Sequence, residues 1–176
     1  LNADMQLDIF EHSRDTMLRN DVLHALQRGD ASAARQAWCV LADEFAHDAA
    51  LAPLERLILT MERPDDAPFK DHAAATAAWI EVRDELEPAA RQLLGDLQAM
   101  QWLKPHWHRL AQRTEGLGFD AAFNETHAAP LLLRADDAAA AAAAVAKIAS
   151  WRRIPAPLAW MAEARWRLDG LQACWG

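Results

Sequence analysis

Histidines and carboxylates are the residues of this sequence best able to do chemistry, because together they can bind a metal ion or transfer protons. Glu44 and His47 are three positions apart, which puts both side chains on one face of a helix. Asp21 and His24 repeat that spacing. Two such pairs on neighbouring helices could surround an ion.

The two pairs cannot meet if the chain folds back between them as a hairpin. Residue 44 would then lie beside roughly residue 15, and His24 would be about 13 Å away along the helix axis. His12 and Asp15 are better-placed partners for Glu44 and His47.

His12 and His47 point away from the apolar stripes of their helices, which is typical of solvated surface residues. The sequence therefore predicts no metal ion and no cofactor. The alternative that stays open is a helical metal- or small-ligand-binding protein, or an enzyme, that uses His12, Asp15, Glu44 and His47.

Other reactive residue types lack the spacing of a catalytic site. His106 and His108 flank Trp107, and on a helix residues at that spacing face different sides. Cys39 and the serines have no recognisable nucleophile motif. Gly116-Leu117-Gly118 lacks the third glycine of a phosphate-binding loop. We therefore expect no catalytic residue, and an enzyme is the less favoured interpretation.

Tryptophan is the unusual feature of the composition, with eight Trp and no Tyr. Trp38 and Trp79 fall on apolar stripes and are expected in the core, as is Cys39. Near the end of the chain, tryptophans alternate with arginines, a mixture that suits either the centre of a protein interface or packing over the surface. The candidate interface residues are Trp151, Arg152, Arg153, Trp160, Arg165 and Trp166.

The charge balance limits the partners. Residues 1–100 carry nine basic and 19 acidic side chains, whereas residues 101–176 carry nine and seven. An acidic majority argues against binding to phosphate backbones, so no nucleic acid is expected. No apolar run reaches the roughly 20 residues of a membrane helix, and no membrane partner is expected. Without a CxxC pair or a signal-peptide pattern, we expect a cytoplasmic protein.

Apolar residues at helical spacing predict helices along the first part of the chain, and about forty alanines reinforce this preference. The first helix ends at Gly29, Asp30 caps the second, and His47-Asp48 closes it. A third stripe covers residues 51–61, and residues 63–68 form a linker.

A fourth helix runs from about Lys70 to Glu87, where Pro88 stops it or starts a fifth that carries residues 93–100. Pro105 suits the first turn of a sixth helix, which ends near Glu115. Residues 116–130 then look like a long loop with room for a helical turn.

The last part of the chain predicts two more helices. Asp136 or Asp137 caps a helix from Ala138 to about Ser150. Residues 154–157, with two prolines, form a rigid connection, and residues 158–171 form the last helix. No convincing β alternation is present in the sequence.

A weak internal repeat aligns the chain with itself at an offset of 107 residues. In both copies one helix ends, an acidic residue caps the next helix, small residues of that helix allow close packing, and a further helix follows. The alternative is simply two amphipathic hairpins. The matched pairs are Leu26 with Leu133, Asp30 with Asp137, Ala34 with Ala141, Ala37 with Ala144, Leu41 with Ile148 and Leu51 with Leu158.

Residues 26–34, continuing to Phe45 and Pro53, resemble a tetratricopeptide-type helical repeat over about 34 residues. Gly29, Phe45 and Pro53 fall where that family places its small turn residue, its aromatic residue and its closing proline. The resemblance implies stacked antiparallel hairpins and a groove that binds peptides or proteins.

The sequence departs from that family at several positions. Leu41 and Asp48 occupy its alanine positions, which puts the close packing of the hairpin in doubt. In the second copy the turn, aromatic and proline positions hold Asp136, Arg152 and Trp160.

We therefore predict an all-α fold, with antiparallel helical hairpins packed as a tetratricopeptide-like array or an irregular bundle. A single domain covers residues 1–176, with hairpin units at roughly 4–62, 69–115 and 130–172. The predicted function is a non-catalytic scaffold or adaptor that binds a protein or peptide partner, including a second copy of itself.

Overall fold

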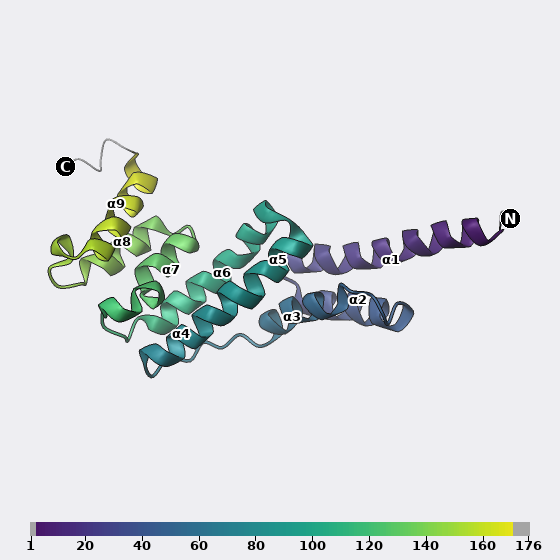
Figure 1. Ribbon diagram of the computed structural model, residues 1–176, viewed down its shortest axis with the longest axis horizontal. Helices are drawn as coiled ribbons and strands as arrows, with labels where there is room; N and C mark the ends of the chain where they lie inside the picture. Colours follow the sequence, from purple (N-terminus) through teal and green to yellow (C-terminus); the bar gives the residue numbers. More distant parts are fainter. Residues whose placement is uncertain (1–2, 171–176) are drawn as a thin grey trace. The chain divides into compact units, whose positions relative to one another are not determined.

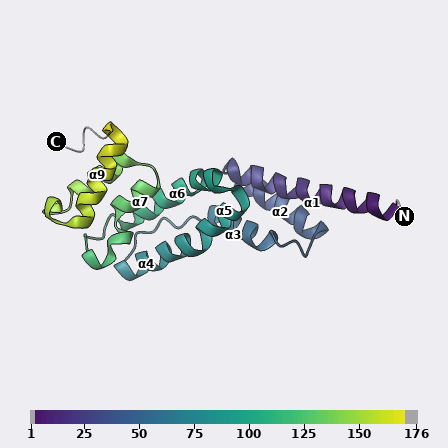
Figure 2. The same cartoon turned by 45° about the horizontal axis from the view of Figure 1, so that its top comes forward.

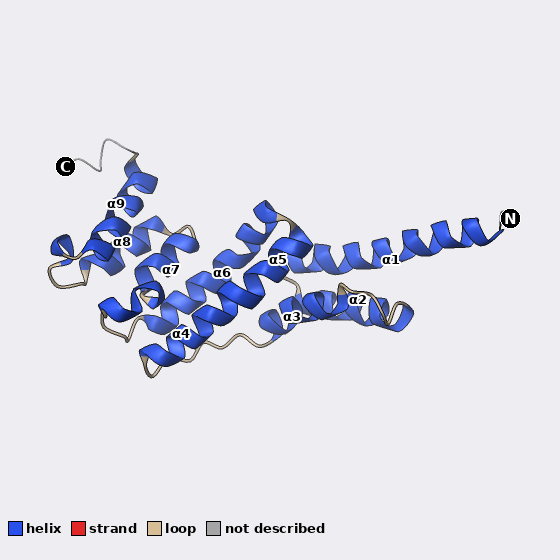
Figure 3. Ribbon diagram, in the orientation of Figure 1, coloured by secondary structure: helices blue, strands red, loops and turns tan. Residues whose placement is uncertain are grey.

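A computed structural model describes the backbone of residues 3–170 and the side chains of residues 14–170. Every regular element in these ranges is a helix (Figures 1 and 3), so the all-α prediction is confirmed. None of the helices described is both long and apolar enough for a bilayer crossing.

The contacts divide the chain into two compact units, where the sequence predicts one domain. The first unit contains the described residues of Leu1–Pro64 and Leu86–Trp102, and the second those of Asp65–Glu85 and Leu103–Gly176. The predicted hairpin unit 69–115 is thus shared between them.

Three consecutive helices form most of the first unit, and we call them the first triplet: α1 (Ala3–Gln27), α2 (Ala31–Glu44) and α3 (Leu51–Glu62). Helices α1 and α2 lie side by side in both views (Figures 1 and 2), and α3 packs on α2. Helix α5 (Glu87–Leu94) contacts α3. The largest fully buried side chains of this unit are Val22, Leu26, Leu41, Leu54, Leu57 and Ile58.

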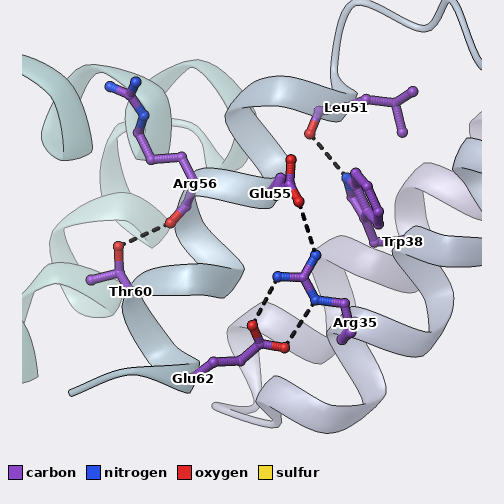
Figure 4. Close-up of polar contacts among 7 residues, drawn as sticks. All are labelled: Arg35, Trp38, Leu51, Glu55, Arg56, Thr60 and Glu62. Carbon is purple, nitrogen blue, oxygen red and sulfur yellow. Dashed lines mark hydrogen bonds and ion pairs between the residues drawn. The ribbon is translucent and has the colours of Figure 1, made fainter.

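Polar side chains tie α2 to α3 (Figure 4). The Arg35 guanidinium donates to both Glu62 oxygens at 2.9 and 2.8 Å and to Glu55 at 3.2 Å. Trp38 donates its indole N–H to the carbonyl of Leu51 at 3.0 Å. The hydrogen bonds from Arg35 lower the pKa of Glu62, so this carboxylate stays charged. The space between the two helices is therefore closed by polar contacts.

The second unit ends in a triplet of its own: α7 (Ala128–Arg134), α8 (Ala138–Ala146) and α9 (Pro155–Asp169). Each of these helices contacts the other two. The core between them is built from Ala129, Val145 and Met161. The unit also contains α4 (His72–Glu81), the π-helical turn η1 (Val82–Leu86) up to Glu85, residues 103–114 of α6 (Asp96–Thr114) and the 3₁₀ helices η2 (Ala121–Thr126) and η3 (Trp151–Arg153).

The turn between α1 and α2 follows the αL helix-ending pattern known as the Schellman motif. Gly29 has φ of +71°, and its N–H donates to the carbonyl of Leu26 at 3.1 Å. Asp30 N–H donates to Ala25 at 3.0 Å, and the Asp30 carboxylate accepts from Ala33 N–H at 2.9 Å. One turn thus ends α1 and caps α2, as predicted for Asp30.

The turn between α7 and α8 has the same set of bonds. Asp136 has φ of +64°, and its N–H donates to the carbonyl of Leu133 at 3.1 Å. Asp137 N–H donates to Leu132 at 2.9 Å, and the Asp137 carboxylate accepts from Ala140 N–H at 3.0 Å. Of the two predicted caps, Asp137 is therefore the one that caps α8. The two aligned segments of the weak repeat share one local geometry.

Two predicted helix boundaries in the middle of the chain are wrong. Gly95, with φ of +76°, ends α5, so Leu97 and Met100 belong to α6 and not to a fifth helix. Pro105 lies inside α6 and not in its first turn. A positive φ suits glycine and stops a helix more firmly than a single proline does here. Pro88 does start α5, after the π-helical turn.

Three further boundaries differ from the prediction. α2 ends at Glu44, before His47. The expected loop 116–130 contains η2 and the start of α7 at Ala128. The prolines of residues 154–157 lie in the first turn of α9 and not in a rigid connection, because proline lacks the N–H that is unpaired there anyway.

Candidate functional site

A cavity of about 650 Å³ lies within the second unit, under the loop of residues 116–119. The end of α6, the start of α7 and one side of α8 form its walls. A volume of this size is in the range of roughly 300–1,000 Å³ that small-molecule sites occupy. Most of its lining is apolar: Ala111, Leu117, Phe119, Ala128, Leu132, Ala140, Ala143, Ala144, Ile148 and Ala149.

His127 is the polar residue held most firmly in this lining. Its Nδ1 accepts the N–H of Ala129 at 3.1 Å, which makes it the N-cap of α7. Its ring stacks on Trp160, with centroids 5.5 Å apart and planes 7° from parallel, and meets the edge of Phe119 at 5.9 Å. Burial, together with the nearby His72, lowers the pKa of His127 to about 4. The ring is therefore neutral near pH 7, and its proton is on Nε2.

The remaining polar lining comes from residues at the end of α6 and beyond α8. His108 is 3.5 Å from a carboxylate oxygen of Asp137, the cap of α8. Glu115 and Lys147 also line the cavity, and neither forms an ion pair with a described residue. The cavity therefore carries one free carboxylate and one free ammonium group.

The six candidate interface residues divide into two groups. Trp151 and Trp160 are partly buried and pack against the core of the second triplet. Arg152 covers the Trp151 ring, with its guanidinium carbon 4.4 Å from the ring centroid. Arg153 and Trp166 are exposed, and the Trp166 residue exposes 52% of its surface. Trp160 thus faces His127, whereas Trp166, about 120° away around the axis of α9, is exposed.

Cation–π contacts between an arginine and an aromatic ring recur throughout the described part of this protein. The same arrangement recurs at Arg35 over Trp38, Arg83 over Trp79, Arg113 over Phe69 and Arg134 over Trp107. Each pair covers an aromatic face while the cation stays near water. The alternation of Trp and Arg does not by itself set the end of the chain apart.

An exposed apolar side of α9 accompanies these pairs. Leu158, Ala159, Ala162 and Trp166 follow the spacing of one helix face, and all four are exposed. Arg165, partly buried, lies beside this stripe. η3, with Arg152 and Arg153, precedes α9, about 16 Å along the helix axis from Trp166. The candidate surface is thus an extended stripe with basic residues at one end.

The proposed metal ligands have other partners in the described part of the chain. Arg14 holds Glu44 through two hydrogen bonds of 3.0 and 2.8 Å, and Arg19 binds Asp15 at 2.6 Å. The side chain of His12 lies outside the described residues, and His47 is exposed. Among the described residues, no three His, Cys, Asp or Glu side chains gather closely enough to hold a metal ion.

Three other expectations have mixed outcomes. Trp79 is buried, but Trp38 is only partly buried and Cys39 is exposed, so the prediction of a core Cys39 is wrong. Cys39 projects from the outer side of α2, while Leu41 on the same helix is fully buried. His106 is largely buried, and this lowers its pKa to about 4.

Sequence reasoning missed the cavity and the stacked pair of His127 and Trp160. Pro130, in the first turns of α7, was a usable signal that a helix starts near residue 128. The stacking partner on α9 follows only from the tertiary packing.

No family model, curated protein or solved structure matches this chain.

Proposed function

We propose that this chain is a non-catalytic helical module that binds a protein or peptide partner through the exposed face of α9. The observation that carries the proposal is the apolar stripe of Leu158, Ala159, Ala162 and Trp166. Large apolar groups gathered on a surface mark interaction sites more often than scattered ones do. A second copy of the chain is included among the partners.

The chemistry of the stripe suits a helix or strand of another protein. Trp166 supplies a large apolar area, and the two alanines allow a partner backbone to approach closely. Residues 151–169 carry four arginines and two acids, so an acidic partner segment fits their charge. Trp166 on the exposed stripe is the expected energetic centre, with a loss of about 2 kcal/mol or more on truncation.

Site-specific crosslinking tests the proposal. The photoreactive residue p-benzoylphenylalanine is placed at position 159, and at position 146 as a matched control, since Ala146 is an exposed alanine on α8. We expect crosslinks from position 159, to the same protein or to a second copy, that disappear with Trp166→Ala. Ile80→Ala, at another exposed apolar residue of the second unit, should leave them intact.

Two outcomes would contradict the proposal. One is equal crosslinking from positions 146 and 159, which would indicate random collision. The other is a crosslinking yield that survives Trp166→Ala while circular dichroism shows an unchanged helix content.

A further inference from the structure

The alanine run of α8 has two sides that do different things. Ala141 and Val145 are fully buried in the triplet core. Ala140, Ala143 and Ala144 line the cavity, and Ala144 also packs against the triplet core. Because alanine fills so little volume, this side of α8 leaves space that leucine or methionine would occupy in an ordinary core.

The floor of this space consists of deeply buried residues. Ala111, Thr114, Ala128 and Leu132 line it and are all nearly inaccessible to solvent. The Thr114 hydroxyl donates to the carbonyl of Ala111 at 2.8 Å, so it offers no free donor to a ligand. An occupant would therefore meet an apolar floor.

Two rings give the cavity a partly aromatic corner, because the planes of Phe119 and His127 are 74° apart. Trp160 stacks on His127 and meets Phe119 edge to face. Because Nδ1 of His127 is occupied by the Ala129 N–H, the N–H at Nε2 is the ring donor left for a ligand. Planar groups pack well against such rings.

The charges of the lining favour neither sign of ligand. Lys147 and Glu115 oppose each other in charge, and His108 is matched by Asp137. An anion attracted by Lys147 would be repelled by Glu115, and a cation attracted by Glu115 would be repelled by Lys147. The favoured occupant carries no net charge.

We infer that this cavity is a binding site for a small, uncharged, planar and mostly apolar molecule with one hydrogen-bond acceptor. Its flat part lies against Phe119 and the alanine side of α8, and its acceptor takes the N–H of His127. This site is separate from the exposed stripe of α9, so it stands or falls independently of the proposed protein interaction.

Prodan, an uncharged naphthyl ketone whose emission reports its surroundings, is the probe. We expect saturable binding of one molecule per chain with a blue-shifted emission. Ala143→Phe should fill the cavity from α8 and weaken binding by about tenfold or more. Ala146→Phe is the matched control, since Ala146 is exposed on the same helix but does not line the cavity, and it should bind Prodan as the unaltered chain does.

Two further arms test the chemistry. Anilinonaphthalene sulfonate, which carries an anionic group, should bind more weakly than Prodan. His127→Asn can still cap α7 but removes the ring, so it should weaken Prodan binding and remove the hydrogen-bond shift in its emission.

Several results would overturn the inference. These are no saturable Prodan binding, equal affinity of the Ala143→Phe and Ala146→Phe proteins, tighter binding of the sulfonate than of Prodan, or Prodan affinity unaffected by His127→Asn. Circular dichroism and thermal melting of each variant establish that it is folded before its affinity is compared.

Discussion

The first and second triplets share a helix-ending turn, an aspartate cap and a buried alanine, yet different side chains fill the space between their second and third helices. Ala34 and Ala141 are both fully buried beside their turns. In the first triplet, Arg35 and Trp38 then bind α3 through polar contacts. In the second, apolar packing joins α8 to α9.

The alignment at an offset of 107 residues locates the difference. Arg35 corresponds to Ala142 and Glu55 to Ala162, so the second triplet lacks both partners of that ion pair. Ala162 instead continues the exposed apolar stripe of α9. The turn and the buried alanine give both triplets the same local backbone geometry. The residues at the outer positions, Arg35 and Glu55 in one triplet and Ala142 and Ala162 in the other, determine whether the helices are joined by ion pairs or keep an apolar surface.

The largest expected effect comes from truncating equivalent core residues, Leu41 and Ile148. Leu41→Ala should lower the free energy of unfolding by about 2–5 kcal/mol, because Leu41 is fully buried. Ile148→Ala should cost roughly 2 kcal/mol, since Ile148 already lines a cavity on one side. Urea unfolding combined with hydrogen exchange of α2 and α8 amides measures each loss where it occurs.

Equal losses at the two positions would show that the cavity is filled by neighbouring side chains in solution. A larger loss at Ile148 than at Leu41 would contradict the comparison outright.

The next effect is a difference in acid sensitivity. His106 and His127 both belong to the second unit, and burial lowers the pKa of each to about 4, against about 6.5 in an unfolded chain. As the pH falls below about 6.5, the unfolded state takes up protons first, so stability present above that pH is lost toward pH 4. The loss in the second unit by pH 5 should be on the order of 2–4 kcal/mol for the two histidines together.

The first triplet should respond only at lower pH. Hydrogen bonds from Arg14 and Arg35 lower the pKa values of Glu44 and Glu62, so the stability from these pairs is present above their unfolded pKa and lost below it. Hydrogen exchange between pH 7 and 4, corrected for intrinsic rates, should show α7–α9 amides opening before α2–α3 amides. In His127→Asn this order should weaken, and the reverse order in the unaltered chain would refute it.

Local signals in the sequence were enough for the capped turns and for the fold class. Asp30 and Asp137 each precede a helical stripe, and a side-chain acceptor at that place satisfies free amide groups of the first turn. The predicted helix start at Pro105 is wrong because a proline removes one hydrogen bond of a helix but does not prevent the helix from continuing. Gly95 is the residue that ends the preceding helix, α5.

The candidate site was less accessible to the same reasoning. Trp166 is exposed and Trp160 points inward because of the way α9 is rotated about its own axis. The short sequence pattern around these two tryptophans does not determine that rotation. The cavity depends on the absence of bulk along α8, and an alanine run predicts a helix equally well with or without a space beside it. These features arise from packing between segments distant in sequence.

A third prediction tests whether the two turns are equivalent in energy. Asp30→Ala and Asp137→Ala should each lower the free energy of unfolding by about 1 kcal/mol, since each removes one acceptor for an amide group at the start of a helix. The double variant should lose the sum, because the residues belong to different units. Asn at either position should restore most of the loss, and a loss confined to one turn in denaturant unfolding would break the equivalence.

The smallest effect separates the two turns at their αL residues. Gly29→Ala puts a side chain at φ of +71°, where a Cβ meets no neighbour within 4 Å, so the substitution is opposed only by backbone strain of about 1–2 kcal/mol. The lower entropy of the unfolded chain offsets about 0.4–1 kcal/mol of this strain. Asp136→Gly removes that strain but also the ion pairs with Lys104 at 2.7 Å and Arg167 at 3.7 Å, exposed contacts worth about 0–1 kcal/mol each. Thermal melting should therefore show a lower midpoint for Gly29→Ala and little change for Asp136→Gly. A clear rise for Asp136→Gly would mean that these ion pairs contribute nothing. A clear fall would mean that they stabilise the second turn, at the position where the first turn has a glycine.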